Sequence, residues 1–182
     1  MVEYEKAYFT GDTYEPYWDF PAHEERVKRL INITHPKSVL DVGCAYGFIV
    51  RRLLEGGIHA MGVDISKWCE EKAKTIIPEH FVRTGADDLS MFKDKEFDVL
   101  YCEGVLEHIP EDKLAKVMSE FERVSERRYL QMSFSFHKDV EKEYGHVTLK
   151  EPWEWFKIVP LYTWIFLGES GTDGGNAWIY KG

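Results

Sequence analysis

The chain has 182 residues, 44% hydrophobic and 30% charged, which excludes a disordered protein and predicts one globular domain. Its 32 acidic residues outnumber 23 Lys and Arg, and a net charge of −9 argues against a large nucleic-acid-binding face. Three cysteines without a CxxC pair, and no apolar run of about 18 residues, predict a cytoplasmic protein without disulfides or a membrane span.

The first thirty residues are rich in aromatic side chains and form the first segment of the expected domain. They can be interpreted as an amphipathic segment that packs on the domain, or as a lid over a bound ligand. A lid would bring aromatic faces, which attract cations, against the ligand. The residues proposed for such a contact are Tyr14, Tyr17 and Trp18.

Strand-like and helix-like hydrophobic patterns alternate through the second segment, residues 38–135. They predict strands over 38–43, 59–64, 81–83, 97–102 and 129–134, and helices over 48–54, 67–76 and 111–124. Charges over 111–128 predict a solvated helix face. Strands that alternate with helices are typical of βαβ units, so we expect an α/β, Rossmann-like doubly wound fold.

The third segment, residues 136–182, has a different character. It predicts a short aromatic helix over 152–157 and two strands over 162–167 and 177–180, with a glycine-rich connector over 168–175. Two strands joined in this way suggest a C-terminal antiparallel hairpin. The expected sheet is therefore seven-stranded and mostly parallel.

The first predicted strand ends in a glycine turn, residues 41–47, that leads directly into a helix. Glycine at 43 and 47 permits a sharp turn and close approach of a ligand to the backbone. The second strand ends at Asp64, 21 residues after Gly43, where a carboxylate can accept hydrogen bonds from two ribose hydroxyls. This pair of features indicates a nucleoside-binding site.

The turn does not fit a phosphate-containing ligand. A dinucleotide turn reads G-x-G-x-x-G, but Ala45 and Phe48 stand at its second and third glycine positions. This disfavours a nicotinamide oxidoreductase. Asp41 would repel a pyrophosphate and suits a cationic amine or sulfonium. The sequence therefore favours a nucleoside without phosphates.

Four segments in this order resemble the class I S-adenosylmethionine-dependent methyltransferases, in their small-molecule (type 11-like) branch. Residues 39–47 resemble the first motif, 62–66 the second, 86–89 the adenine-side segment and 97–109 the fourth-strand motif. The resemblance covers about 100 residues. It implies a single methyltransferase domain that binds S-adenosylmethionine and transfers its methyl group to an O or N atom of a small molecule, leaving S-adenosylhomocysteine.

The resemblance also implies site residues. Those expected near the methionine part of the cofactor are Asp41, Gly43, Cys44, Ala45, Gly47, Cys102 and Tyr17. Those expected near its ribose and adenine are Asp64, Ile65, Ala86 and Asp87. The chain departs from the family at Ala45, where glycine is usual, and at Gly85, where an Asp is common. The adenine amino group must then find Asp87, Asp88 or a backbone carbonyl.

Candidate proton acceptors follow the fourth and fifth strands: Glu103, His108 and His137. His108 could instead position the next helix. Tyr14, Trp18 and His146 are candidates for contact with the acceptor. The irregular histidine spacing predicts no metal site. We expect a small-molecule acceptor as partner, no nucleic acid or membrane, and a monomer or homodimer. The alternative is a non-catalytic S-adenosylmethionine-binding regulatory or partner subunit.

Overall fold

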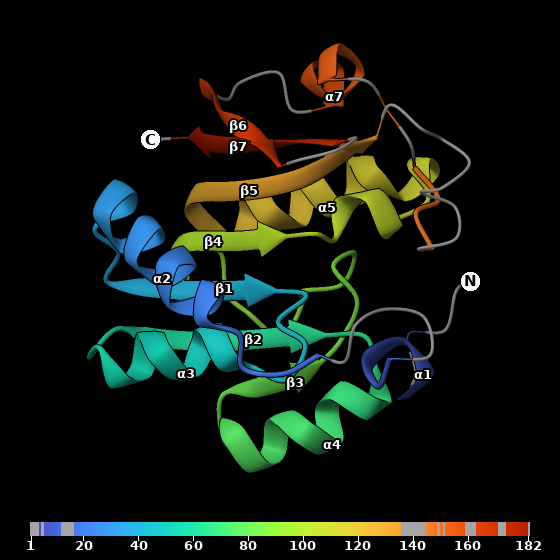
Figure 1. Cartoon of the computed structure of the whole chain (residues 1–182). Coiled ribbons are helices and arrows are strands. Elements are labelled where there is room, and N and C mark those ends of the chain that lie inside the picture. Colours follow the sequence, from blue (N-terminus) through green and yellow to red (C-terminus); the bar gives the residue numbers. More distant parts are fainter. Residues whose placement is uncertain are drawn as a thin grey trace.

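A twisted seven-stranded sheet forms the centre of the molecule, with strand order β3-β2-β1-β4-β5-β7-β6 (Figure 1). The computed structural model describes residues 4, 6–11, 17–135, 145–148, 150, 152–158, 163–170 and 174–181. None of the helices in these ranges is long and apolar enough to cross a lipid bilayer.

Five strands run parallel, as the alternating strand and helix patterns predicted. They are β1 (Ser38–Val42), β2 (His59–Asp64), β3 (Phe81–Arg83), β4 (Phe97–Glu103) and β5 (Ser125–Ser135). The chain proceeds from β1 outward to β3 and returns to β4 on the other side of β1. Strand order therefore reverses between β1 and β4, and in open α/β sheets ligands bind beyond the carboxyl ends of the strands at such a point.

Two antiparallel strands extend the sheet beyond β5. β7 (Gly174–Lys181) pairs with β5 and with β6 (Thr163–Ser170), and both pairings are antiparallel. The strands are longer than predicted, because residues 168–170 and 174–175 of the expected connector belong to them. The Rossmann-like α/β class predicted from the sequence is confirmed.

Helices cover both faces of the parallel strands. α5 (Glu111–Val124) lies on one face, while α2 (Pro21–Thr34), α3 (Phe48–Glu55) and α4 (Lys67–Ile76) contribute to the core on the other. Because side chains alternate along a strand, Leu40 packs on the α5 side and Val39 on the opposite side. Strands buried on both faces in this way read as continuous apolar runs. The other helices among the described residues are α1 (Lys6–Phe9), the 3-10 helix η1 (Leu106–His108) and α7 (Pro152–Ile158).

β5 and α2 also differ from the sequence prediction. β5 begins at Ser125, directly after α5, rather than at residue 129. Residues 21–34, expected only as part of an aromatic N-terminal segment, form α2, with Pro21 near its start and Val27 and Leu30 buried. α2 packs against α3, and this contact positions the polar face of α2 next to the site described below.

Candidate cofactor and acceptor site

A cavity of about 840 Å³ lies beyond the carboxyl ends of β1, β2 and β4. This volume is in the range of pockets that bind small molecules. Figure 1 shows α1 at the end of the sheet to which the arrowheads of these strands point. The N-terminal aromatic residues that line the cavity are Tyr4, Tyr8, Phe9, Tyr17 and Phe20. They pack on the domain and enclose the cavity at the same time.

The glycine turn forms one wall of the cavity. Gly43 has a φ of 78°, and the N–H groups of Gly43 and Cys44 donate to the carbonyl oxygen of Val63 at 2.8 and 3.1 Å. A Cβ atom on Gly43 would lie 2.2 Å from Cγ2 of Val105. Glycine is therefore required here by both the backbone conformation and the lack of space.

Two neighbouring positions refine the sequence prediction. Ala45 has a φ of 48°, so it occupies the left-handed conformation in which the resembled family has glycine. Gly47 was expected beneath the cofactor, but it does not line the cavity. It precedes α3 with a φ of 83°, and a Cβ there would lie 2.3 Å from Cδ1 of Ile77. Its role is to let α3 pack against the end of α4.

Asp64 is held in place by the backbone on both sides. Its Oδ2 accepts the N–H of Ala45 at 3.0 Å, and its Oδ1 accepts the N–H of Ser66 at 2.9 Å. A backbone hydrogen bond from Ile65 also reaches the carboxylate. Each carboxylate oxygen can accept two hydrogen bonds, so these donors leave part of the acceptor capacity of Asp64 for a ligand. Asp64 also lines the cavity. The geometry matches a carboxylate oriented to receive two neighbouring hydroxyl groups.

Further carboxyl groups approach the same cavity from β1 and β4. Asp41 is 3% exposed. Burial raises the pKa of Asp41 well above its usual value, Glu103 and Asp64 raise it further, and Arg26 opposes them. Glu103 forms an ion pair with Arg26 of α2, Nε to Oε1 at 3.0 Å, and accepts the hydroxyl of Tyr101. Burial raises the pKa of Glu103, whereas Arg26 and the Tyr101 hydrogen bond lower it. A bound cation would stabilise the ionised cluster.

We expect Asp41→Asn to stabilise the ligand-free protein. A carboxyl group whose pKa is raised by folding stabilises the fold at low pH, and that contribution is lost as the pH rises through the folded pKa. Asn avoids this loss, so its advantage should be larger at pH 8 than at pH 5. At pH 8 we expect the melting temperature to rise by about 2–4 °C, the change produced by roughly 1 kcal/mol in a domain of this size. A lower melting temperature than wild type at both pH values would show that Asp41 is not destabilising.

The adenine-side segment accounts for the second departure from the family pattern. A Cβ on Gly85 would lie 2.6 Å from Oδ1 of Asp87. The Asp87 carboxylate thus occupies the space next to Gly85, and its Oδ2 forms an ion pair with Nζ of Lys113 at 3.0 Å. Ala86 and Ile65 also line the cavity, and Ile65 is 50% exposed. An apolar side chain this exposed offers a surface for a planar ligand.

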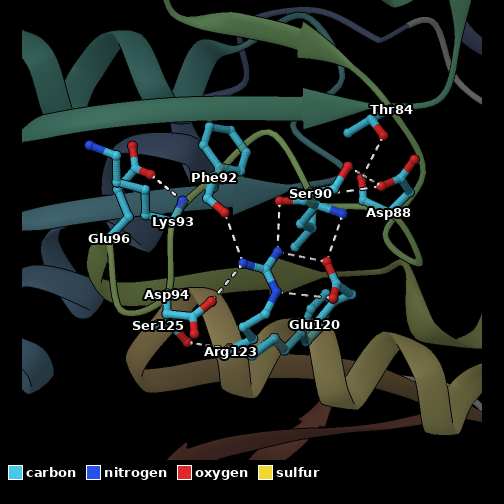
Figure 2. Close-up of polar contacts among 12 residues, drawn as sticks. Thr84, Asp88, Ser90, Phe92, Lys93, Asp94, Glu96, Glu120, Arg123 and Ser125 are labelled. Carbon is cyan, nitrogen blue, oxygen red and sulfur yellow. Dashed lines mark hydrogen bonds and ion pairs between the residues drawn. The ribbon is translucent and has the colours of Figure 1, made fainter.

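Arg123 fixes this segment to α5 (Figure 2). Its guanidinium donates to the carbonyl oxygens of Leu89 and Phe92 at 2.9 and 2.8 Å, and to the carboxylates of Glu120 and Asp94. Glu120 in turn accepts the N–H of Leu89 at 2.9 Å. The prediction that residues 111–128 present only a solvated face is therefore wrong at this position, where a charged side chain connects two elements.

We expect Arg123→Ala to destabilise the fold and loosen residues 84–96. Two carbonyl groups and Glu120 would lose a charged donor, and hydrogen bonds to charged groups contribute about 1.5–3 kcal/mol. A loss of about 2 kcal/mol should appear in urea unfolding, with faster amide hydrogen exchange at residues 89–92. Lys116→Ala, on an exposed position of the same helix, is the control. Equal stability of the two variants would contradict this assignment.

The candidates on the acceptor side separate into three groups. His108 and Glu103 line the cavity. Trp18 is 54% exposed and packs on Phe20 outside the cavity lining, and His146 is buried behind His108, with ring centroids 4.6 Å apart. Tyr14 and His137 lie outside the described residues.

Among the cysteines, Cys44 lines the cavity, but Cys102 is fully buried and does not. The expectation that Cys102 contacts a cofactor is therefore not supported, because its side chain faces the core beneath α5. Burial raises the pKa of both thiols well above the usual value. Neither thiol is suited to act as a nucleophile.

The cavity lining also includes residues that the sequence prediction did not single out, among them Arg26, Val105 and Lys113. Arg26 lies on α2, a helix that was not predicted. Val105 fell within a recognised motif, but its contact with Gly43 depends on the turn geometry. Lys113 is one of the two exposed lysines of α5, and its ion pair with Asp87 distinguishes it from Lys116.

Comparisons with known proteins find a family match, similar curated proteins and similar solved structures. Residues 40–128 match the family described as "Methyltransferase domain". Two ubiquinone biosynthesis O-methyltransferases are similar: that of Thiobacillus denitrificans is 32% identical over 105 residues, which cover 50% of this chain and 44% of that protein. That of Haemophilus ducreyi is 33% identical over 92 residues, which cover 46% and 39%. The chain spans less than half the length of these curated relatives.

Solved structures resemble the whole fold. The magnesium protoporphyrin IX methyltransferase of Synechocystis PCC 6803, solved with bound S-adenosylmethionine, has a TM-score of 0.65 at 17% identity and covers 88% of this chain and 78% of its own. The geranyl diphosphate C-methyltransferase of Streptomyces coelicolor A3(2) has a TM-score of 0.69 at 11% identity, with 86% and 77% covered. At these identities the likeness shows the fold alone. Residues 40–128, just under half of the chain, thus match the methyltransferase-domain family, and the chain shares the fold of these solved methyltransferases.

Proposed function

We propose that this protein transfers the methyl group of S-adenosylmethionine to an oxygen or nitrogen atom of a small molecule. The observation that carries the proposal is the carboxylate arrangement at the switch point of the sheet. Asp64 keeps acceptor capacity for ribose hydroxyls, and Asp41 lies buried in the same cavity. The carboxyl groups of Asp41, Asp64 and Glu103 at one end of the cavity suit a ligand that carries an ammonium and a sulfonium group.

The chain's own residues bind and orient the two substrates. Asp64 would hold the ribose, Asp41 the amino group, and Ile65 and Ala86 the adenine. When bound, S-adenosylmethionine supplies an activated methyl group, which the acceptor's lone pair takes as the carbon–sulfur bond breaks and its electron pair stays on sulfur. The N-terminal aromatic residues would exclude water and align the acceptor, an effect of proximity and orientation.

The acceptor is proposed to bind next to His108. Among the described candidates, Glu103 is engaged by Arg26 and Tyr101, whereas His108 stands in the cavity wall. Tyr4 and Tyr8 contact the edge of its ring, with centroids 5.2 and 6.2 Å away. The names of the curated relatives support an oxygen acceptor. An aromatic surround of this kind suits a planar hydroxylated molecule.

Transfer of a radiolabelled methyl group tests the proposal. The protein would be incubated with methyl-labelled S-adenosylmethionine and panels of phenols, catechols, carboxylic acids and amines, with His108→Gln alongside. We expect label in one chemical class, lost or strongly reduced in the variant. Binding of S-adenosylmethionine with no transfer to any panel would overturn the enzymatic proposal in favour of a non-catalytic binding subunit.

A further inference from the structure

The fold brings together three potential metal ligands that are far apart in sequence. Glu107 and His108 lie on η1, His146 lies 38 residues later, and one ligand atom from each is within 4.8 Å of the other two. Glu107 is 1% exposed and His146 is 9% exposed, whereas His108 reaches the cavity. We propose that Glu107, His108 and His146 bind a divalent transition-metal ion at the wall of the cavity. The irregular histidine spacing predicted no metal site. That prediction did not consider contacts between residues far apart in the sequence, such as that of His146 with Glu107 and His108.

The orientation of His108 fits a metal ligand. Its Nδ1 lies 3.2 Å from the carbonyl oxygen of Gly145. A carbonyl oxygen can only accept a hydrogen bond, so Nδ1 carries the proton and the neutral ring has its lone pair on Nε2. Metal-binding histidines are usually oriented in this way, with the second ring nitrogen donating to a carbonyl or carboxylate.

Backbone contacts hold the two parts of the cluster together. The N–H groups of Val147 and Thr148 both donate to the carbonyl oxygen of Glu107 at 3.0 Å, and the hydroxyl of Thr148 donates to the carbonyl oxygen of Ile109 at 2.5 Å. The segment that carries His146 is thus fixed against η1. Ligand bonds of about 2.0–2.2 Å place neighbouring ligand atoms roughly 3–3.5 Å apart, so binding requires the ligand atoms to approach one another by up to about 1.5 Å.

The ligand set determines the class of ion. Two imidazoles and one carboxylate suit Zn²⁺, Fe²⁺, Co²⁺ or Ni²⁺, and leave coordination positions open. Mg²⁺ prefers oxygen ligands and ordered water, so it should bind poorly here. The ionised carboxylate of Glu107 would neutralise one of the two positive charges of the ion. The metal centre would therefore keep a net positive charge next to the cavity.

An open coordination position beside His108 gives the ion a role in acceptor binding, which rests on the proposed function. His108 and Val147 both line the cavity, so an acceptor hydroxyl there could bind the ion directly. A metal-bound hydroxyl is more acidic than a free one, and its proton can pass to solvent near neutral pH. His108 would then act on the acceptor as a metal ligand, and no separate general base would be needed.

Titration with Co²⁺ and Zn²⁺ tests the metal site directly. Untagged protein, stripped with chelator, would be titrated calorimetrically with each ion, with the visible absorption of Co²⁺ reporting imidazole ligation. We expect one ion per chain, at least tenfold weaker binding in Glu107→Gln and in His146→Gln, and no change in His59→Gln, an exposed histidine at the start of β2. Mg²⁺ in the same titration should show weak binding only.

Two results would overturn the proposal: no stoichiometric binding by folded wild-type protein, or equal binding by wild type and both cluster variants. Thermal unfolding of the variants shows whether they remain folded, and the more conservative Glu107→Gln keeps the shape of the side chain. S-adenosylhomocysteine binding is measured in parallel. Metal binding without nucleoside binding would contradict the proposed function and leave the metal site standing, so the two failures are distinguishable.

Discussion

Asp64→Asn is expected to weaken binding of S-adenosylmethionine by at least about 100-fold. Both oxygens of Asp64 accept backbone N–H groups, and in our account their second lone pairs receive two ribose hydroxyls. The Asn amide replaces one acceptor by a donor, which would face the N–H of Ala45 or Ser66. Because Asn is also uncharged, both hydrogen bonds to the ribose are weakened or lost, and about 1.5 kcal/mol for each corresponds to roughly 100-fold.

Isothermal titration of the purified variant measures this effect. Asp112→Asn, which removes an exposed carboxylate at the start of α5, is the matched control and should bind like wild type. Circular dichroism would establish that both variants are folded. Unchanged affinity in a folded Asp64→Asn protein would mean that Asp64 only organises the turn and does not contact the ligand.

Gly43→Ala is expected to destabilise the protein by about 2–4 kcal/mol. A non-glycine residue in the left-handed region costs roughly 1–2 kcal/mol, and crowding in a packed region costs about 1–3 kcal/mol. At Gly43 both apply, because φ is 78° and the added Cβ would lie 2.2 Å from Cγ2 of Val105. Gly57 also has a φ of 78° but has nothing within 4 Å of a built Cβ, so Gly57→Ala isolates the backbone cost.

The side chain of Val105 provides a second test of the same contact. Val105→Ala removes the atom that overlaps the new Cβ, so the double variant should recover most of the difference between Gly43→Ala and Gly57→Ala. Urea unfolding of wild type, Gly43→Ala, Gly57→Ala, Val105→Ala and the Gly43→Ala/Val105→Ala double variant measures these differences in the free energy of unfolding. If Gly43→Ala and Gly57→Ala are equally destabilising, the space next to Gly43 is not limiting.

Local patterns were sufficient to predict the parallel core of the sheet and the ligand-binding turn. The strands before Gly43 and Asp64 are buried on both faces, so they appear as apolar runs that end abruptly in glycine or acid. Those endings coincide with the carboxyl edge of the sheet, where the cavity lies. The signal was strong because backbone conformation and ligand contact require the same residues.

Features that depend on tertiary contacts were not predictable in this way. α2 is a charged helix with few buried residues, so its hydrophobic pattern is weak. It also follows a segment rich in aromatic residues, and Pro21 at its start does not by itself distinguish a helix from a turn. In the sequence Arg123 is indistinguishable from a solvated arginine. Only the folded structure brings the carbonyl groups of Leu89 and Phe92 within hydrogen-bond distance of it. His146 meets Glu107 only because backbone N–H groups beyond it bind η1.

The most direct test of the central claim is a calorimetric titration of the wild-type protein with S-adenosylmethionine and S-adenosylhomocysteine, with NAD⁺ as the comparison ligand. Our account predicts one site per chain, a Kd of about micromolar for both S-adenosyl compounds, and no measurable binding of NAD⁺. The absence of binding to either S-adenosyl compound by folded protein, or tighter binding of NAD⁺, would contradict it.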